Sequence, residues 1–342
     1  MTSFRNILFL ISTCFMCLFI SCESSTLPSD EVGRSSSSLI TKSCSDEMTA
    51  IQVLGSGGPL PYDARASTGY LVWIGGKSRL MIDAGGGTFV RFGEAGGQLE
   101  DLDVVLLSHF HADHVSDLPA FLWGAGIAGR VKRNLTVVGP TGNADYPDIR
   151  TFLKTLFDGD KGVFRQLSSI PLDVVSADAS GTKVTTVFKD QDLEVQALGV
   201  PHANSPTLAF KVNLGGKTIV FGGDQNGRNP AFLQFIQNVD FFVAHLAISE
   251  APGLAAGEDI SLLELHAPPT LVGELAATGE VGTLLLSHLM GLGQSNPRSA
   301  YFSLSNMQSN LELIKKKFSG TVIQAEDLLC IPMTNRRLEQ AQ

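Results

Sequence analysis

The chain has 342 residues, of which 44% are hydrophobic and 17% charged. A chain of this length and composition can bury a large core in one big domain or two small ones, which excludes general disorder. Its formal net charge of −9 disfavours a surface that holds RNA or DNA, because neutralising phosphates requires clustered Lys and Arg, so we expect no nucleic-acid partner.

The N-terminus has the pattern of an export signal. One positive charge at Arg5 precedes an apolar run from Ile7 to Ile20, after which the chain turns polar. A small residue, Ser21, followed by Cys22 resembles the lipobox of bacterial lipoproteins, in which the cysteine is lipidated and becomes the new N-terminus. The resemblance implies a signal peptide over residues 1–21 and a protein anchored through lipid on Cys22 to the periplasmic side of a bacterial membrane. An ordinary cleaved signal, which would leave a soluble periplasmic or secreted protein, and an uncleaved anchor are the alternatives.

The next stretch separates this signal from a folded domain. Residues 22–45 are rich in serine, with four in a row at Ser35–Ser38, and predict a flexible tether ahead of a domain that spans residues 46–342. Two cysteines, Cys44 and Cys330, remain once the others leave with the signal or carry lipid. In an oxidising periplasm this pair could form a disulfide between the two ends of the domain, and two unpaired buried thiols are equally compatible.

The rest of the chain alternates short apolar runs typical of strands with stretches of helical periodicity. The predicted strands lie at residues 50–54, 70–74, 79–82, 104–107, 135–138, 193–200, 207–212, 218–221, 241–244, 282–286 and 321–324. The predicted helices lie at residues 115–128, 149–157, 231–237, 269–277 and 305–316. Strands that are apolar almost throughout and alternate with helices indicate an α/β protein, and the two similar halves indicate a sandwich of two sheets with helices outside.

Three histidines and a carboxylate follow the fourth predicted strand, within the segment Ser108–Asp117. The segment lies on a strand-to-helix loop, where His109 and His111 can point in the same direction while Asp113 and His114 turn to a second point nearby. Neutral imidazole and carboxylate are ligands of Zn²⁺ and similar ions, so two metal ions could share this segment. Solvated loop histidines, the alternative, would not explain why histidines also recur at the ends of other apolar strands.

Single polar residues at the ends of other predicted strands complete this set. His202, Asp224 and His288 each follow an apolar run. We expect these strand ends to gather at one edge of the sheets, where loops meet, so the three side chains should converge with the histidine-rich segment. Asp83 ends the third strand before three glycines, and we expect it both to cap the next helix and to hold a loop of the metal site from behind the ligands.

These separated signatures resemble, in order and over roughly residues 50–325, the metallo-β-lactamase-fold hydrolases. Within that family they resemble the branch that contains ribonuclease Z and related arylsulfatase-like and phosphodiesterase-like enzymes. The resemblance implies a four-layer αβ/βα sandwich and a site for two divalent metal ions, with Zn²⁺ as the expected metal. It implies seven ligands: His109, His111 and His202 on one ion, Asp113, His114 and His288 on the other, and Asp224 bridging the two. It also implies that Asp83 supports the ligands and that a water molecule between the ions attacks the substrate.

Two further histidines remain to be placed. His266 precedes the helix predicted at residues 269–277 and resembles the histidine that ribonuclease Z uses beside its metals. On that resemblance Asp113 and His266 are the catalytic residues, and His266 donates a proton to the leaving group or hydrogen-bonds a phosphoryl or sulfuryl oxygen. The alternative for His266 is a histidine that only caps the helix. His245, near another strand end, is either a histidine at the edge of the core or one with a catalytic or substrate-binding role.

The sequence departs from ribonuclease Z where that family carries a long tRNA-binding arm. About twenty residues separate His202 from Asp224, enough for two strands and a turn at Gly215–Gly216. Because the arm is missing, the charge is acidic and the signal directs export, we do not expect ribonuclease activity.

The sequence therefore predicts a binuclear metal-dependent hydrolase of small-molecule anionic esters, either phosphodiesters or aryl sulfates. A hydrolase of lactones or other esters, and a non-catalytic lipoprotein that binds metal or a ligand, are the alternatives. Arg65 and Arg228 are the cations nearest the expected rim, and either could meet an anionic substrate or form a surface ion pair. The sequence is compatible with a homodimer.

Overall fold

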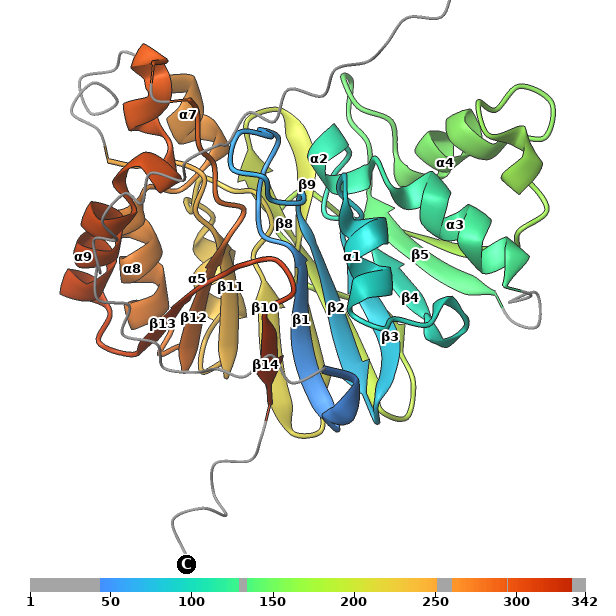
Figure 1. The fold of residues 1–342 in the computed structure, drawn as a ribbon, viewed down its shortest axis with the longest axis horizontal. Coiled ribbons are helices and arrows are strands. Elements are labelled where there is room, and N and C mark those ends of the chain that lie inside the picture. The colour runs from blue at the N-terminus through green and yellow to red at the C-terminus, as the bar shows by residue number, and fades with distance from the viewer. Residues whose placement is uncertain (1–43, 129–133, 251–259, 294, 334–342) are drawn as a thin grey trace, which may run out of the picture. The chain divides into compact units, whose positions relative to one another are not determined.

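The structure, a computed structural model, describes residues 44–128, 134–250, 260–293 and 295–333 (Figure 1). The predicted signal peptide, the predicted lipidation site at Cys22 and all but the end of the predicted tether lie outside these ranges. Within the ranges, no helix has both the length and the apolar character that crossing a membrane requires.

Two seven-stranded sheets form the centre of the fold, with strand orders β14-β1-β2-β3-β4-β5-β6 and β13-β12-β11-β10-β9-β8-β7. The first sheet consists of β1 (Thr49–Gly55), β2 (Gly69–Ile74), β3 (Lys77–Ile82), β4 (Val104–Leu106), β5 (Leu135–Pro140), β6 (Leu172–Ala177) and β14 (Cys330–Pro332). The second consists of β7 (Thr185–Lys189), β8 (Leu193–His202), β9 (Ser205–Leu214), β10 (Lys217–Phe221), β11 (Phe241–His245), β12 (Thr283–Ser287) and β13 (Thr321–Gln324). The sequence did not predict β6, β7 and β14. All three are edge strands, and edge strands lack the continuous apolar run of a strand that is paired on both sides and buried on both faces.

Helices cover the outer face of each sheet (Figure 1). Those over the first sheet are α1 (Thr88–Glu94), α2 (Ala112–Val115), α3 (Leu118–Ile127) and α4 (Ile149–Phe157). Those over the second are α5 (Pro230–Phe235), α8 (Pro269–Thr278) and α9 (Met307–Lys317), while the short α7 (Ile260–Leu265) lies near the loops that follow the strands. One apolar core fills the space between the sheets, around Tyr70, Phe210 and Phe221, and a further core lies between each sheet and its helices. The predicted four-layer αβ/βα sandwich is thus confirmed.

The helix predicted over residues 115–128 is instead two helices, α2 and α3, which meet at Asp117. The side chain of Asp117 accepts hydrogen bonds from the backbone N–H groups of Gly87 and Phe89, at 2.8 and 3.0 Å, where α1 begins. The expectation that Asp83 caps α1 is therefore wrong, because Asp117 accepts the hydrogen bonds of these backbone N–H groups instead.

A disulfide joins Cys44 to Cys330. Cys330 lies in β14, which pairs antiparallel with β1, and Gln52 of β1 stands opposite Cys330 in that pairing. Of the two alternatives left by the sequence, the structure contains the disulfide, which ties the first described turn to the last strand.

The strand directions decide where the polar strand ends gather. In the first sheet β3, β4 and β5 run parallel, and in the second β10, β11 and β12 run parallel. The carboxyl ends of parallel strands lie at the same edge of a sheet, and loops at that edge commonly carry binding sites.

Candidate metal centre

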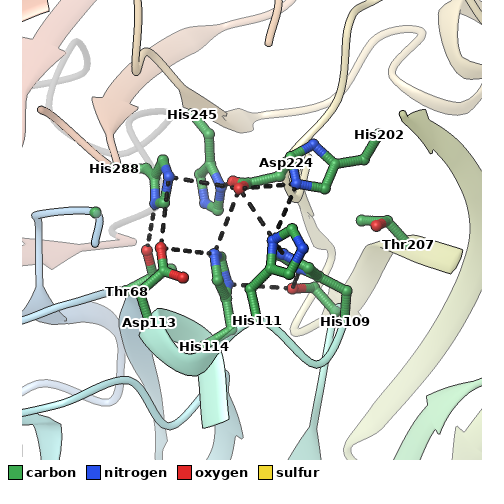
Figure 2. A network of polar contacts seen from close by, with 12 residues as sticks. Thr68, His109, His111, Asp113, His114, His202, Thr207, Asp224, His245 and His288 are labelled. Carbon is green, nitrogen blue, oxygen red and sulfur yellow. Dashed lines mark hydrogen bonds and ion pairs between the residues drawn. The ribbon is translucent and has the colours of Figure 1, made fainter. Parts of the chain in front are cut away.

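All seven histidines of the chain lie together at this edge, each close to a carboxylate or another imidazole of the group. Figure 2 labels six of them, all but His266. His109, His111 and His114 follow β4, His202 ends β8, His245 ends β11, His266 follows α7 and His288 follows β12. Of the site residues predicted from the sequence, the structure brings together all seven expected ligands, Asp83 and His266.

One donor group consists of His109, His111 and His202. The Nε2 atom of His109 lies 2.9 Å from Nδ1 of His111, and Nε2 of His202 lies 3.3 Å from that same Nδ1. The group takes its members from both sheets, because His109 and His111 follow β4 and His202 ends β8.

The second donor group consists of Asp113, His114 and His288. Oδ2 of Asp113 lies 3.5 Å from Nε2 of His114 and 3.8 Å from Nε2 of His288. Asp113 and His111 keep some exposure while His109, His114, His202 and His288 are buried, so the open side of the site lies at Asp113 and His111.

Asp224 lies between the two groups. Its Oδ2 atom is 3.4 to 3.9 Å from the Nε2 atoms of four histidines: His288, His114, His202 and His109. A single carboxylate oxygen thus faces imidazoles of both groups (Figure 2).

Asp83 and Ser108 orient His109 and His114 in the loop after β4. Asp83 accepts hydrogen bonds from the backbone N–H of Ser108 at 2.7 Å, from its hydroxyl at 2.8 Å and from Nδ1 of His114 at 2.8 Å. Because the Ser108 hydroxyl donates to Asp83, its oxygen accepts from Nδ1 of His109 at 3.1 Å. In His109 this leaves the Nε2 lone pair, and in His114 the Nε2 atom, facing the centre.

The same arrangement recurs at two further histidines. The Thr68 hydroxyl donates to the carbonyl of Gly57 at 3.1 Å and so accepts from Nδ1 of His288 at 2.6 Å. Nδ1 of His202 donates to the carbonyl of Leu265 at 2.8 Å. In both residues the proton sits on Nδ1, and the Nε2 lone pair is free for a ligand. Burial lowers the pKa values of His202 and His288 and keeps their imidazoles neutral near pH 7.

His114 has the opposite electrostatic balance. Burial by itself lowers its pKa, but the carboxylates of Asp224, Asp83 and Asp113 outweigh that effect and raise the pKa well above its usual range. Its Nε2 atom is buried and has no hydrogen-bond partner among the described residues. A cation held between these carboxylates would replace the proton on His114.

These observations fit divalent metal ions. The site brings together imidazole nitrogens that have free lone pairs and fixed tautomers, and two carboxylates. It also contains the buried Nε2 atom of His114, which has no hydrogen-bond partner among the described residues. Nitrogen-rich sets of this kind suit zinc and related ions, and outer partners such as Asp83 and Thr68 are what metal-binding histidines ordinarily have.

His266 lies inside the site, not at a helix cap. The cap position of α8 is Pro268, with no side-chain cap, and the His266 ring centroid lies 5.3 Å from that of His202 and 5.5 Å from that of His288. Its side chain is buried, and its Nδ1 has no hydrogen-bond partner in the described part of the chain. Burial lowers the pKa of His266 to about 3, so its imidazole is neutral near pH 7.

The two arginines expected at the rim are both engaged with the protein. Arg65 donates to the hydroxyl of Ser56 at 2.6 Å and to the carbonyl of Ala325 at 3.0 Å. Arg228 is half exposed and pairs with Glu264 at 2.9 Å. The structure therefore favours contacts within the protein over contact with substrate: Arg228 forms a surface ion pair, and Arg65 hydrogen-bonds other loops.

A cavity of about 490 Å³ adjoins the donor group that contains His202. Among the polar residues that line it are Asn143, Asp178, Ser180, Asn204 and Ser205. The hydroxyl of Ser205 is buried and has no hydrogen-bond partner among the described residues. Apart from His202, Asp178 is the one acidic or basic side chain among the described residues that line the cavity.

Sequence reasoning missed Thr68, Ser108 and Tyr70. Ser108 lies inside the motif directly after β4 and could have been found by asking what orients the histidines beside it. Thr68 and Tyr70 lie at the start of β2, an antiparallel strand that begins at the site edge, and nothing in the sequence marks that direction.

Comparison with known proteins places the chain among related sequences. The family model described as the Metallo-beta-lactamase superfamily matches residues 62–233. A ribonuclease Z of Clostridium acetobutylicum is 33% identical over 156 residues, which are 46% of this chain and 47% of that protein. A ribonuclease Z of Mycobacterium sp. (strain KMS) is 28% identical over 251 residues, 71% of this chain and 85% of that protein.

The chain thus aligns with less than half the length of the Clostridium relative. Among solved structures, the short form of human tRNase Z superposes with a TM-score of 0.61 at 17% identity, covering 84% of this chain and 100% of that one. That superposition shows a shared fold.

Proposed function

Because the chain belongs to the metallo-beta-lactamase superfamily, we propose that it is a metal-dependent hydrolase of small-molecule esters. We propose phosphodiesters as its substrates in preference to aryl sulfates. The observation that carries the proposal is the position of Asp224 Oδ2 between two donor groups. His109, His111 and His202 would hold one ion, Asp113, His114 and His288 would hold a second, and Asp224 lies within reach of both groups. The name of the relatives, ribonuclease Z, favours a phosphodiester over a sulfate.

Two divalent cations bound there supply Lewis-acid chemistry, which activates a water molecule and stabilises negative charge on an ester oxygen. His266 faces the same space with a neutral imidazole and offers an N–H to an ester oxygen. An anionic substrate beside His266 would favour a proton on its imidazole, which could pass to the leaving group. Asp113, partly exposed at the open side, would hold an ion where the substrate arrives.

The cavity next to His202 would take one substituent of the ester. Its lining offers hydroxyls and amides, with one carboxylate and no Lys or Arg among the described residues. Such a lining suits a neutral group that carries hydroxyls, such as a sugar or nucleoside, better than a polyanion.

Small molecules are proposed in preference to RNA. The segment between His202 and Asp224 is two strands, β9 and β10, joined by a turn at Gly215 and Gly216, with no arm. Arg65 and Arg228 are committed to other groups, and the chain is acidic overall. These features oppose binding of a long polyanion at this site.

We also propose export and anchoring through lipid on Cys22, on the periplasmic side of a bacterial membrane. The sequence pattern before Cys22 supports this, and the disulfide suits an oxidising compartment. Labelling with a radioactive fatty acid tests it. Incorporation in the wild type and loss in Cys22→Ala are expected, and equal labelling of both would overturn the lipid anchor.

The catalytic proposal is tested by assaying the zinc-loaded, full-length chain with bis-p-nitrophenyl phosphate and p-nitrophenyl sulfate in parallel. Phosphodiester turnover that is lost in Asp113→Ala and lowered in His266→Ala, but kept in Asp173→Ala on the surface, is expected. Turnover of the sulfate alone would contradict the phosphodiester proposal and identify aryl sulfates as the substrate class. Zinc binding without either activity would contradict both and point to other esters or to a binding role.

A further inference from the structure

Asp224 is held from behind by a buried chain of hydrogen bonds that runs through His245 to Tyr70. Nδ1 of His245 lies 2.6 Å from Oδ1 of Asp224, and Nε2 of His245 lies 3.0 Å from the hydroxyl of Tyr70. All three residues are buried, with exposed fractions of 2% for Asp224, 5% for His245 and 0% for Tyr70. Figure 2 shows the His245 ring directly against the carboxylate of Asp224.

The direction of each hydrogen bond follows from the groups involved. A carboxylate only accepts, so Nδ1 of His245 carries the proton and donates to Asp224. Nε2 of a neutral His245 then has a lone pair, and the Tyr70 hydroxyl, a donor near neutral pH, donates to it. Both nitrogens of His245 are therefore occupied, and although His245 lies close enough to Asp224 and His288 to be considered a ligand, it has no lone pair left for an ion.

The chain of hydrogen bonds connects the two sheets. Tyr70 belongs to β2 of the first sheet, while His245 ends β11 of the second and Asp224 follows β10. The Tyr70 ring packs on Phe221 at a centroid distance of 5.2 Å, and the His245 ring stacks on His288 at 4.9 Å with planes 17° apart. His245 is thus fixed on three sides, by Tyr70, His288 and Asp224.

Asp224 follows a turn of two glycines after β10. Gly222 and Gly223 precede it, and Gly223 has a positive φ of 62°, as a turn that brings Asp224 back toward the site requires. With Oδ1 engaged by His245, the carboxylate can turn only one oxygen, Oδ2, toward the four imidazoles of the two donor groups.

We propose that Tyr70 and His245 are positioning residues, which fix Asp224 with a single oxygen between the two metal ions and thereby set the affinity for them. The inference rests on the proposed function, because it assigns Asp224 to both ions. It gives His245 a role that the sequence left open, and it gives Tyr70 a role that the sequence did not indicate.

The test is the affinity of the full-length protein for Zn²⁺, measured by competition with a chromogenic chelator, in Tyr70→Phe, His245→Asn and His245→Ala. The Asn side chain keeps a donor for Asp224 but loses the link to Tyr70, whereas Ala loses both. We expect zinc binding to weaken by roughly 10-fold in Tyr70→Phe and His245→Asn and by up to about 100-fold in His245→Ala. The double variant Tyr70→Phe with His245→Ala should bind no more weakly than His245→Ala alone, because both act through one chain of hydrogen bonds.

Ser78→Ala is the matched control, because it removes a hydroxyl that is equally buried and donates to the carbonyl of Gln98 at 3.0 Å, outside the site. It should lower the melting temperature of the metal-free protein without changing zinc affinity. If Tyr70 only packs in the core, Tyr70→Phe should likewise lower the melting temperature and leave zinc affinity unchanged. That result would overturn the inference and leave the proposed function intact. A wild-type chain that binds no zinc would overturn both.

Discussion

The hydroxyl of Thr68 accepts a hydrogen bond from Nδ1 of His288 at 2.6 Å, across the boundary between the two sheets. Thr68 immediately precedes β2 in the first sheet, and His288 follows β12 in the second. Tyr70, two residues further along, donates a hydrogen bond to Nε2 of His245 at 3.0 Å. The start of β2 therefore orients side chains that the other sheet supplies, and the geometry of the site depends on how the two sheets pack.

Replacing Thr68 by valine keeps the shape of the side chain and removes this contact. His288 then loses the partner that places the proton on Nδ1 and the lone pair on Nε2. We expect zinc to bind about 10-fold more weakly. Chelator competition measures the change, and Thr155→Val, which removes a hydroxyl from an exposed position of α4, should bind zinc like the wild type. Equal affinity in both variants would show that Thr68 does not orient His288.

The metal-free protein should be less stable in mild acid. Burial lowers the pKa values of His109, His202 and His288 in the folded state, whereas in an unfolded chain histidine titrates at about 6.5. The unfolded state then binds more protons below about pH 6.5, and each such histidine costs up to about 1.4 kcal/mol of stability per pH unit. The raised pKa of His114 acts in the other direction, but its contribution is complete below about pH 6.5 and is lost only as the pH rises through its folded value.

Urea unfolding of the EDTA-treated protein at about pH 7.5 and about pH 5.5 measures this dependence. A lower free energy of unfolding at the acid pH is expected. Equal or higher stability there would contradict the view that these imidazoles are buried and neutral.

The sequence was sufficient for the fold and for the candidate ligands, because the features that reveal them are local. An apolar run before His109 and single polar residues such as Asp224 at the ends of other runs are visible without knowing how the strands pair. The partners of the ligands were harder, because they come from elements whose direction only the folded chain shows. The supporting role of Asp83 was predicted, but the helix start that Asp83 was expected to cap is capped by Asp117. Tyr70 is indistinguishable in the sequence from a core aromatic, because its contact with His245 depends on where β2 begins.

The disulfide between Cys44 and Cys330 should stabilise the domain without affecting the site. Replacing both cysteines by serine should lower the free energy of unfolding by roughly 2–4 kcal/mol, because the unfolded chain then lacks the cross-link. Urea unfolding measures the loss, and zinc content should stay as in the wild type because the pair lies outside the donor groups. Unchanged stability would mean that the disulfide adds nothing to the paired β1 and β14.

The cavity beside His202 predicts a dependence on the ester's substituent. Ser205→Ala removes a buried hydroxyl with no hydrogen-bond partner in the described structure, so the fold should lose little. KM for thymidine 5′-p-nitrophenyl phosphate should rise roughly 3- to 10-fold, as expected for one lost hydrogen bond, while KM for bis-p-nitrophenyl phosphate stays constant. Equal changes for both substrates would argue against a subsite for a hydroxyl-bearing group.

The central claim is that two ions share Asp224, and the number of zinc ions per purified chain tests it most directly. Elemental analysis after removal of loosely bound metal should give about two zinc ions in the wild type and in Asp173→Asn, a surface control, and fewer than one in Asp224→Ala. One ion or none in the wild type, or two in Asp224→Ala, would contradict the account.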